Sequence, residues 1–107
     1  MAKSTNEAWF SNRWKIIGGE EPVNEHRFSH PRKWRFDRAW IKQKIGLELE
    51  GYGHARFNRY HGDVLKYNRA SELGWRVFRI TYLMVQKDDV SVFEQIAGLL
   101  GSVGGDS

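Results

Sequence analysis

Residues 34–50 read WRFDRAWIKQKIGLELE, and this stretch decides the fold. Apolar side chains alternate with charged or small ones in both of its halves, at positions Trp34, Phe36, Trp40, Ile45, Leu47 and Leu49. Alternation with a period of two residues is typical of β-strands that bury one face. Residues 41–44 separate the two halves and predict a short connection. The stretch therefore predicts two antiparallel strands joined as a hairpin.

The register of this hairpin follows from its short connection. With residues 41–44 as the turn, Asp37 lies opposite Glu48 and Arg35 lies opposite Glu50. The three carboxylates then share one face, and burial of the apolar face fixes the register, because a slip of one residue would bury the acids. Directly opposed carboxylates repel each other unless a positive group lies between them. The sequence therefore predicts a cation at this face.

Two kinds of cation fit this face. A divalent ion such as Mg²⁺ prefers oxygen ligands and is held by one or two carboxylates together with substrate phosphate, and Asp37 and Glu48 offer such carboxylates. The ion would lower the pKa of a bound water and stabilise charge on a phosphate oxygen. The alternative is a solvated face on which Arg35 pairs with Glu50, while Arg38 or Lys66 neutralises the remaining acids. The alternation of residues does not choose between them.

The rest of the chain predicts helices that cover a small sheet. Apolar residues at helical spacing, and Gly74 after one such segment, indicate where helices run and where one of them ends. The expected elements are a helix at 1–17, an edge strand at 23–28, a helix at 60–73, a strand at 75–81, a helix at 90–100 and a flexible tail at 101–107. Together with the hairpin they predict an α/β (α+β) fold, a small mixed sheet flanked by helices in the order α-β-β-β-α-β-α.

Composition narrows the classes of protein. A chain of 107 residues fits one domain, 1–107, with its core at about 20–100. Cysteine is absent, which excludes disulfides, thiolate zinc sites and cysteine nucleophiles. No apolar run is long enough to cross a membrane, and the N-terminus lacks the apolar segment of a signal peptide, so we expect a soluble protein that is not exported. The net charge of +4 favours a polyanionic partner.

Basic residues flank the acids on both sides. A negative pocket rimmed by positive charge suits a protein that binds nucleic acid, because the rim neutralises phosphates. The imidazole of a histidine can also contact a phosphate near neutral pH. The residues that we expect to bind nucleic acid are Arg32, Lys33, Arg35, Arg56, Arg59 and His61.

Several short motifs, taken together, resemble a known superfamily. They are WRFD at 34–37, LELEG at 47–51, HAR at 54–56, DVLKYN at 63–68 and LGWRVFR at 73–79. In this order and spacing they are similar to the PD-(D/E)XK nucleases, especially the small phage and bacterial endonucleases of the very-short-patch-repair type. The resemblance covers residues 20–100 approximately and implies a restriction-endonuclease-like fold.

The resemblance also implies roles for individual residues. Asp37 and Glu48 would hold Mg²⁺, for which Mn²⁺ can substitute. The family pattern has a lysine two residues after the second acid, and Glu50 stands there instead, where it would serve as a third metal ligand or as a base. Lys66 would take the role of that lysine by stabilising negative charge; its alternative role is an ion pair with Asp63. His54 would protonate the leaving group, or else be a solvated loop residue.

The sequence therefore predicts a hydrolase, a Mg²⁺-dependent endonuclease that cleaves phosphodiester bonds of DNA, including branched or damaged DNA. A catalytically inactive nucleic-acid-binding module on the same fold, or an RNA-cleaving nuclease, are the alternatives. The expected partner is DNA and not a membrane, and the small size leaves a homodimer open. The resemblance implies an intracellular location, in the cytoplasm of a bacterium or of a phage-infected host.

Overall fold

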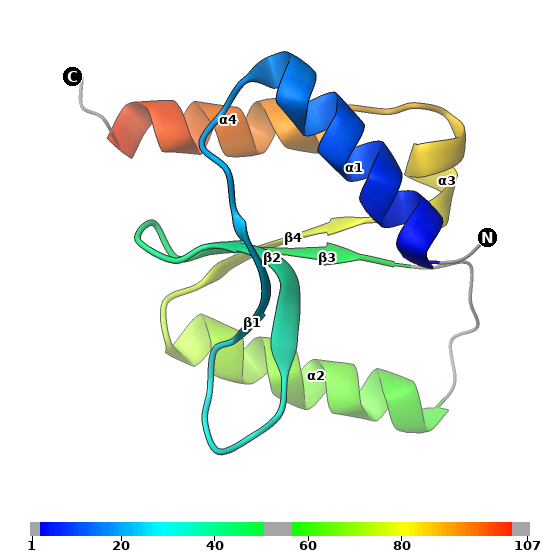
Figure 1. Cartoon of the computed structure of the whole chain (residues 1–107). Helices are drawn as coiled ribbons and strands as arrows, with labels where there is room; N and C mark the ends of the chain where they lie inside the picture. The colour runs from blue at the N-terminus through cyan, green and yellow to red at the C-terminus, as the bar shows by residue number, and fades with distance from the viewer. Residues whose placement is uncertain (1–2, 51–56, 104–107) are drawn as a thin grey trace. The chain divides into compact units, whose positions relative to one another are not determined.

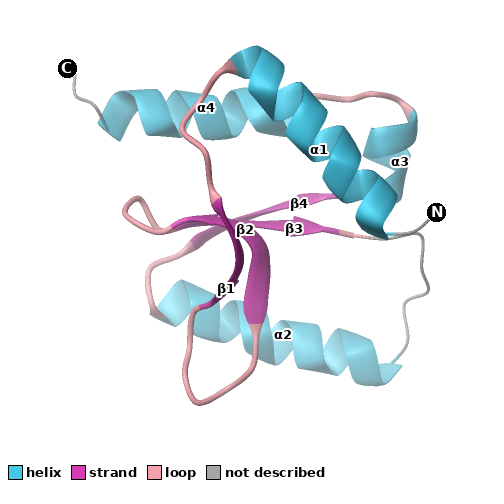
Figure 2. Cartoon of the chain, viewed as in Figure 1, coloured by secondary structure: helices cyan, strands magenta, loops and turns pink. Residues whose placement is uncertain are grey.

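The computed structural model describes residues 3–50 and 57–103, and its sheet is flanked by helices (Figures 1 and 2). In chain order the elements are α1 (Lys3–Ile17), β1 (Val23–Arg27), β2 (Arg35–Trp40), β3 (Ile45–Leu49), α2 (Phe57–Glu72), β4 (Arg76–Ile80), α3 (Tyr82–Gln86) and α4 (Ser91–Val103). The predicted fold class and the predicted order of elements are confirmed, with α3 as one additional short helix.

The four strands form one mixed sheet in the order β1-β2-β3-β4. The predicted hairpin register is confirmed, because Trp40 pairs with Ile45, Ala39 with Gly46, and Arg38 with Leu47 across antiparallel strands. β1 pairs with β2, also antiparallel, and lies at the edge as predicted. β4 runs parallel to β3, with hydrogen bonds from Arg76 N–H to the Lys44 carbonyl and from Glu50 N–H to the Ile80 carbonyl. A parallel pair needs a crossover, and α2 provides it.

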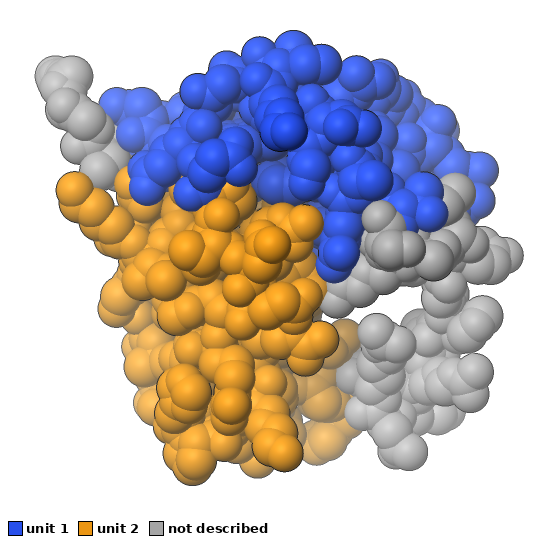
Figure 3. Space-filling model, in the orientation of Figure 1, with its two compact units in different colours: residues 1–21, 49–52, 79–107 blue, residues 22–48, 53–78 orange. Residues whose placement is uncertain are grey.

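The chain divides into two compact units, coloured blue and orange in Figure 3. Unit 1 comprises residues 1–21, 49–52 and 79–107, and unit 2 comprises residues 22–48 and 53–78. In unit 1, aromatic rings join α1 to α4: Phe10 and Phe93 lie edge to face with centroids 5.2 Å apart, and Trp14 lies 6.0 Å from Phe93. All three side chains are buried.

The core of unit 2 lies between α2 and the sheet. Its buried members are Phe28, Phe36, Ala39 and Ala70. The rings of Phe28 and Phe36 stack with centroids 4.2 Å apart. The Phe36 ring also covers Gly46, where a Cβ atom would lie only 2.7 Å from the ring. Glycine is therefore needed at position 46 for the ring to approach the strand.

Two predicted boundaries were wrong, and one helix was not predicted. α2 begins at Phe57, within the segment expected to be a loop, and α4 continues to Val103, so that residues 101–103 belong to a helix and not to a flexible tail. Residues 104–107 lie outside the described part of the chain. The helix α3 was not predicted, because five residues are too few to show helical periodicity. Its start is fixed by Thr81, whose Oγ1 accepts a hydrogen bond from the Met84 N–H at 3.2 Å.

The alternative interpretation, a solvated acidic face on the hairpin, does not match the burial of Asp37. Asp37 is 2% exposed and Arg38 7% exposed, so β2 carries buried side chains on both faces. β2 is an interior strand, and packing against its two faces, not its pairing at both edges, buries these side chains. Within the described ranges, no helix is long and apolar enough to cross a membrane.

Candidate functional site

Three neighbouring strands of unit 2 each contribute one carboxylate: Glu25 from β1, Asp37 from β2 and Glu48 from β3. We call these three residues the acidic cluster. Asn24 pairs with Arg38 and His26 with Phe36, so Glu25 and Asp37 face each other across β1 and β2. Their carboxylate oxygens lie within 4.8 Å of each other.

Asp37 and Glu48 follow directly on the last paired residues of the hairpin. Arg38 pairs with Leu47; Asp37 precedes Arg38 in β2, and Glu48 follows Leu47 in β3. The Asp37 side chain is buried, and the Glu48 side chain is only 14% exposed. The guanidinium of Arg38 donates from Nη1 to the Asp37 carbonyl at 2.9 Å. Both acids are therefore largely shielded from water. That they face each other closely enough to share an ion stays a prediction.

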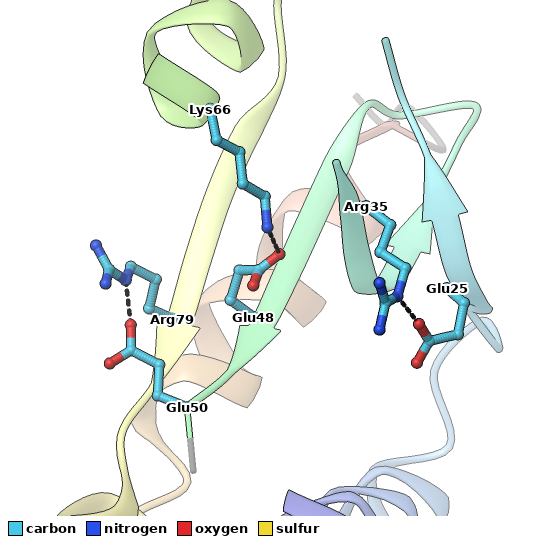
Figure 4. Close-up of polar contacts among 6 residues, drawn as sticks. All are labelled: Glu25, Arg35, Glu48, Glu50, Lys66 and Arg79. Atoms are coloured by element: carbon cyan, nitrogen blue, oxygen red, sulfur yellow. Dashed lines mark hydrogen bonds and ion pairs between the residues drawn. The ribbon is translucent and has the colours of Figure 1, made fainter. Parts of the chain in front are cut away.

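Arg35 is the first cation beside the acidic cluster. Its Nε donates to a carboxylate oxygen of Glu25 (Figure 4). The pKa of Arg35 is raised, chiefly by this hydrogen bond and the negative charge of Glu25, and to a smaller extent by the charges of Asp37 and Glu48. In the alternative interpretation Arg35 pairs with Glu50; in the structure Arg35 pairs with Glu25, and Glu50 pairs with Arg79.

Lys66 is the second cation. It projects from α2, and its Nζ donates to Glu48 Oε2 at 2.8 Å, as Figure 4 shows. Both side chains are largely buried, at 12% and 14% exposure. The ammonium also lies 5.8 Å from the centroid of the Phe36 ring. Among the described residues, Lys66 thus pairs with Glu48 and not with Asp63, the partner expected in the alternative interpretation.

Glu50 is held by contacts within unit 1. Its carboxylate pairs with Arg79 of β4 (Figure 4). Its backbone N–H donates to the Ile80 carbonyl at 2.8 Å, and its own carbonyl accepts from Nδ2 of the buried Asn6 at 2.8 Å. These contacts fix the backbone where β3 ends. Its role as a metal ligand stays a prediction.

The structure describes the surroundings of some of the residues expected to bind nucleic acid, and not of others. Arg32 is exposed and its guanidinium lies 4.0 Å from the centroid of the Trp34 ring, and Lys33 is exposed beside it. His61 is exposed on α2, and Arg59 belongs to the same helix. His54 and Arg56 lie outside the described residues.

Glu25 is the member of the acidic cluster that sequence reasoning missed. It lies on the predicted edge strand, but the segment between β1 and β2 runs from Phe28 to Trp34 and is too long to fix a register by turn geometry. β1 carries a single acid, so no alternation of acids marks it in the sequence. Glu25 can sit opposite Asp37 once His26 is aligned with Phe36.

Comparisons with known proteins identify a fold neighbour. No protein-family model matches the chain, and no curated protein sequence matches it. Among solved structures, the chain is similar to the catalytic domain of the homing endonuclease I-Bth0305I, with a TM-score of 0.67 and 18% sequence identity. The match covers 88% of this chain and 91% of that domain. The chain therefore has the fold of an endonuclease catalytic domain.

Proposed function

We propose that the chain is a divalent-metal-dependent endonuclease that hydrolyses phosphodiester bonds of DNA at the acidic cluster. The observation that carries the proposal is the shielded pair of acids on adjacent strands, Asp37 and Glu48, with the ammonium of Lys66 bonded to Glu48. Similarity of fold to the catalytic domain of a homing endonuclease supports it. The net charge of +4 supports DNA as the substrate.

The acidic cluster fits a hard divalent ion. Carboxylate oxygens are the ligands that Mg²⁺ prefers, and one or two carboxylates with substrate phosphate commonly suffice. Asp37 and Glu48 would hold the ion, and Glu25, whose carboxylate lies within 4.8 Å of that of Asp37, is an additional ligand candidate. Arg35 and Lys66 balance part of this negative charge, which allows the carboxylates to stay shielded from water.

A bound Mg²⁺ would supply an activated water and would stabilise charge on the phosphate. The protein's own contribution comes from its two cations. Lys66 Nζ lies at the acidic cluster and is positioned to stabilise the negative charge that develops on a phosphate oxygen. Arg35 contacts Glu25 and is half exposed, so its guanidinium can also meet a phosphate from the solvent side. Support of the site by Glu50 and proton donation by His54 remain parts of the proposal.

The proposal is tested by assaying cleavage of supercoiled, duplex and branched DNA with Mg²⁺, Mn²⁺ or EDTA. Asp37→Asn and Glu48→Gln keep the size of the side chain, and each should lower the rate at least about 100-fold, as loss of metal-site groups commonly does. Glu94→Gln, an exposed acid on α4, is the matched control and should cleave like the parent chain. Lys66→Met should lower the rate about 100- to 1000-fold.

Calorimetric titration with Mn²⁺ measures metal binding independently of DNA cleavage. Asp37→Asn and Glu48→Gln should lose Mn²⁺ binding, whereas Lys66→Met should keep it, because that substitution removes a positive charge that opposes the ion. Unchanged cleavage in both acid variants would refute the proposed site. DNA binding without cleavage under any metal would instead favour an inactive binding module, and cleavage of RNA in preference to DNA would favour an RNA-cleaving enzyme.

A further inference from the structure

Unit 2 has an open recess apart from the acidic cluster. The recess, of about 460 Å³, lies between the segment that joins β1 to β2 and one side of α2. The residues that matter for its chemistry are Ser29, Arg32 and Trp34 from that segment and Leu65, Asn68 and Arg69 from α2. None of the three acids of the acidic cluster lines it. The recess is therefore a separate place for a ligand to bind.

Two guanidinium groups of the recess are held in place. Arg69 donates from Nε to Ser29 Oγ at 3.1 Å and from Nη1 to Glu72 Oε1 at 2.8 Å, which ties α2 to the β1–β2 segment. Arg32 lies over the Trp34 ring at 4.0 Å from its centroid. Cations that are already ordered lose less conformational entropy when they bind an anion. The recess contains two guanidinium groups and one carboxylate, that of Glu72, so its charge favours a negatively charged ligand.

The size and the lining of the recess indicate a ligand larger than a phosphate. Pockets for organic ligands span about 300 to 1000 Å³, and this recess falls within that range. Leu65 is exposed and offers apolar surface. The Trp34 ring, whose faces carry Arg32 and Phe28, offers its edge. The exposed amide of Asn68 offers a donor and an acceptor of hydrogen bonds. An anion with a flat apolar ring and a polar edge matches this combination, and a nucleotide has all three.

We propose that this recess binds one unpaired nucleotide of the DNA substrate. Arg32 and Arg69 hold its phosphate, Leu65 and the edge of the Trp34 ring contact its base, and Asn68 bonds the polar edge of the base. A base inside an intact duplex is stacked between its neighbours and cannot enter such a recess. The chain therefore prefers DNA with an extrahelical or single-stranded nucleotide. This inference rests on the proposed function for DNA as the substrate.

The test is a binding measurement on the full chain in EDTA, where hydrolysis does not interfere. Fluorescence anisotropy compares a labelled duplex that carries one extrahelical 2-aminopurine with the same duplex fully paired. Contact of one base with an aromatic side chain is worth about 1–3 kcal/mol, so the bulged duplex should bind roughly tenfold more tightly. The emission of the 2-aminopurine should also change on binding, because its base leaves water for the recess.

Two exposed positions of the recess give variants that leave the core untouched. Asn68→Ala should remove most of the preference for the bulge, whereas Asn12→Ala, an equally exposed asparagine on α1, should retain it. Arg32→Ala should weaken binding of the bulged duplex more than that of the paired duplex, with the exposed Arg76→Ala as its control.

Equal affinity for the two duplexes, or an unchanged preference in both Asn68→Ala and Arg32→Ala, would overturn the inference. A chain that cleaves DNA but shows no preference for the bulge overturns this inference and leaves the proposed function standing. A chain that prefers the bulge but cleaves no DNA with any metal overturns the proposed function alone.

Discussion

The ion pair between Lys66 and Glu48 can be tested by measuring how much it contributes to the stability of the fold. Lys66→Met removes the ammonium and keeps the length of the side chain, which leaves the Glu48 carboxylate without its bond at 2.8 Å. The two side chains are 12% and 14% exposed, so water can replace little of that contact. The variant should therefore be less stable, even though no apolar contact of the core is lost.

The expected loss can be worked from burial. Removing one partner of a buried ion pair costs about 3–5 kcal/mol, because the other charge is left desolvated. Residual exposure lowers this figure, and Arg35 still offers positive charge near Glu48. We expect a loss of about 2 kcal/mol, which corresponds to a shift of about 1 M in the urea midpoint. Glu48→Gln should cost a similar amount, since it leaves Lys66 as the unpaired charge.

The assay is urea unfolding followed by circular dichroism for the parent chain, both single variants and the double variant. The double-mutant cycle should give a coupling energy of about 1–2 kcal/mol, as expected for residues in direct contact. Lys15→Met, at an exposed position of α1, is the control and should change the stability by less than about 0.5 kcal/mol. A coupling energy below about 0.5 kcal/mol would refute the reasoning, because the pair would then be solvated like a surface ion pair.

Two further predictions concern the rest of the fold. Gly46→Ala places a Cβ atom 2.7 Å from the Phe36 ring and should destabilise the chain by about 1–3 kcal/mol in the same urea assay, whereas Gly98→Ala meets no atom within 4 Å and should not destabilise it. The pKa of Asp88 lies below its usual 3.8, mainly because of its hydrogen bond with Arg13, so its charge stabilises the fold above the unfolded pKa and this stabilisation is lost as the pH falls through the folded pKa. Asp88→Asn should therefore be less stable than the parent chain near neutral pH, with a difference that vanishes well below pH 3.8; a constant difference across that range would contradict the assignment.

The hairpin could be predicted because its determinants are local. Alternating apolar residues and a short connection specify both strands and their register, and the observed pairing of Arg38 with Leu47 agrees with that expectation. The end of α2 could also be predicted from the sequence, because Gly74 adopts a positive φ of 86° there, a conformation that favours glycine. The start of α2 was harder to predict, because its first turn lacks the helical spacing of apolar residues that would distinguish it from a loop.

The partners of the charged residues could not be predicted in the same way. The alternative interpretation paired Arg35 with Glu50, yet Arg35 binds Glu25, because β1 lies beside β2 and brings that acid within reach. Lys66 had two equally plausible partners along the sequence, Asp63 on its own helix and Glu48 on a strand. Packing of α2 against the sheet through Ala70 and Phe36 selected Glu48.

The sequence by itself determined the strands, their alternation and the place of two acids on adjacent strands, since these depend on neighbours within a few residues of each other. Only the tertiary structure decided that Asp37 is buried, that Glu25 lies beside Asp37, and that Lys66 pairs with Glu48. The physical reason is that a charge is stabilised by whatever lies near it in space. For a buried charge, that neighbour is set by how helices and strands pack, which local sequence does not encode.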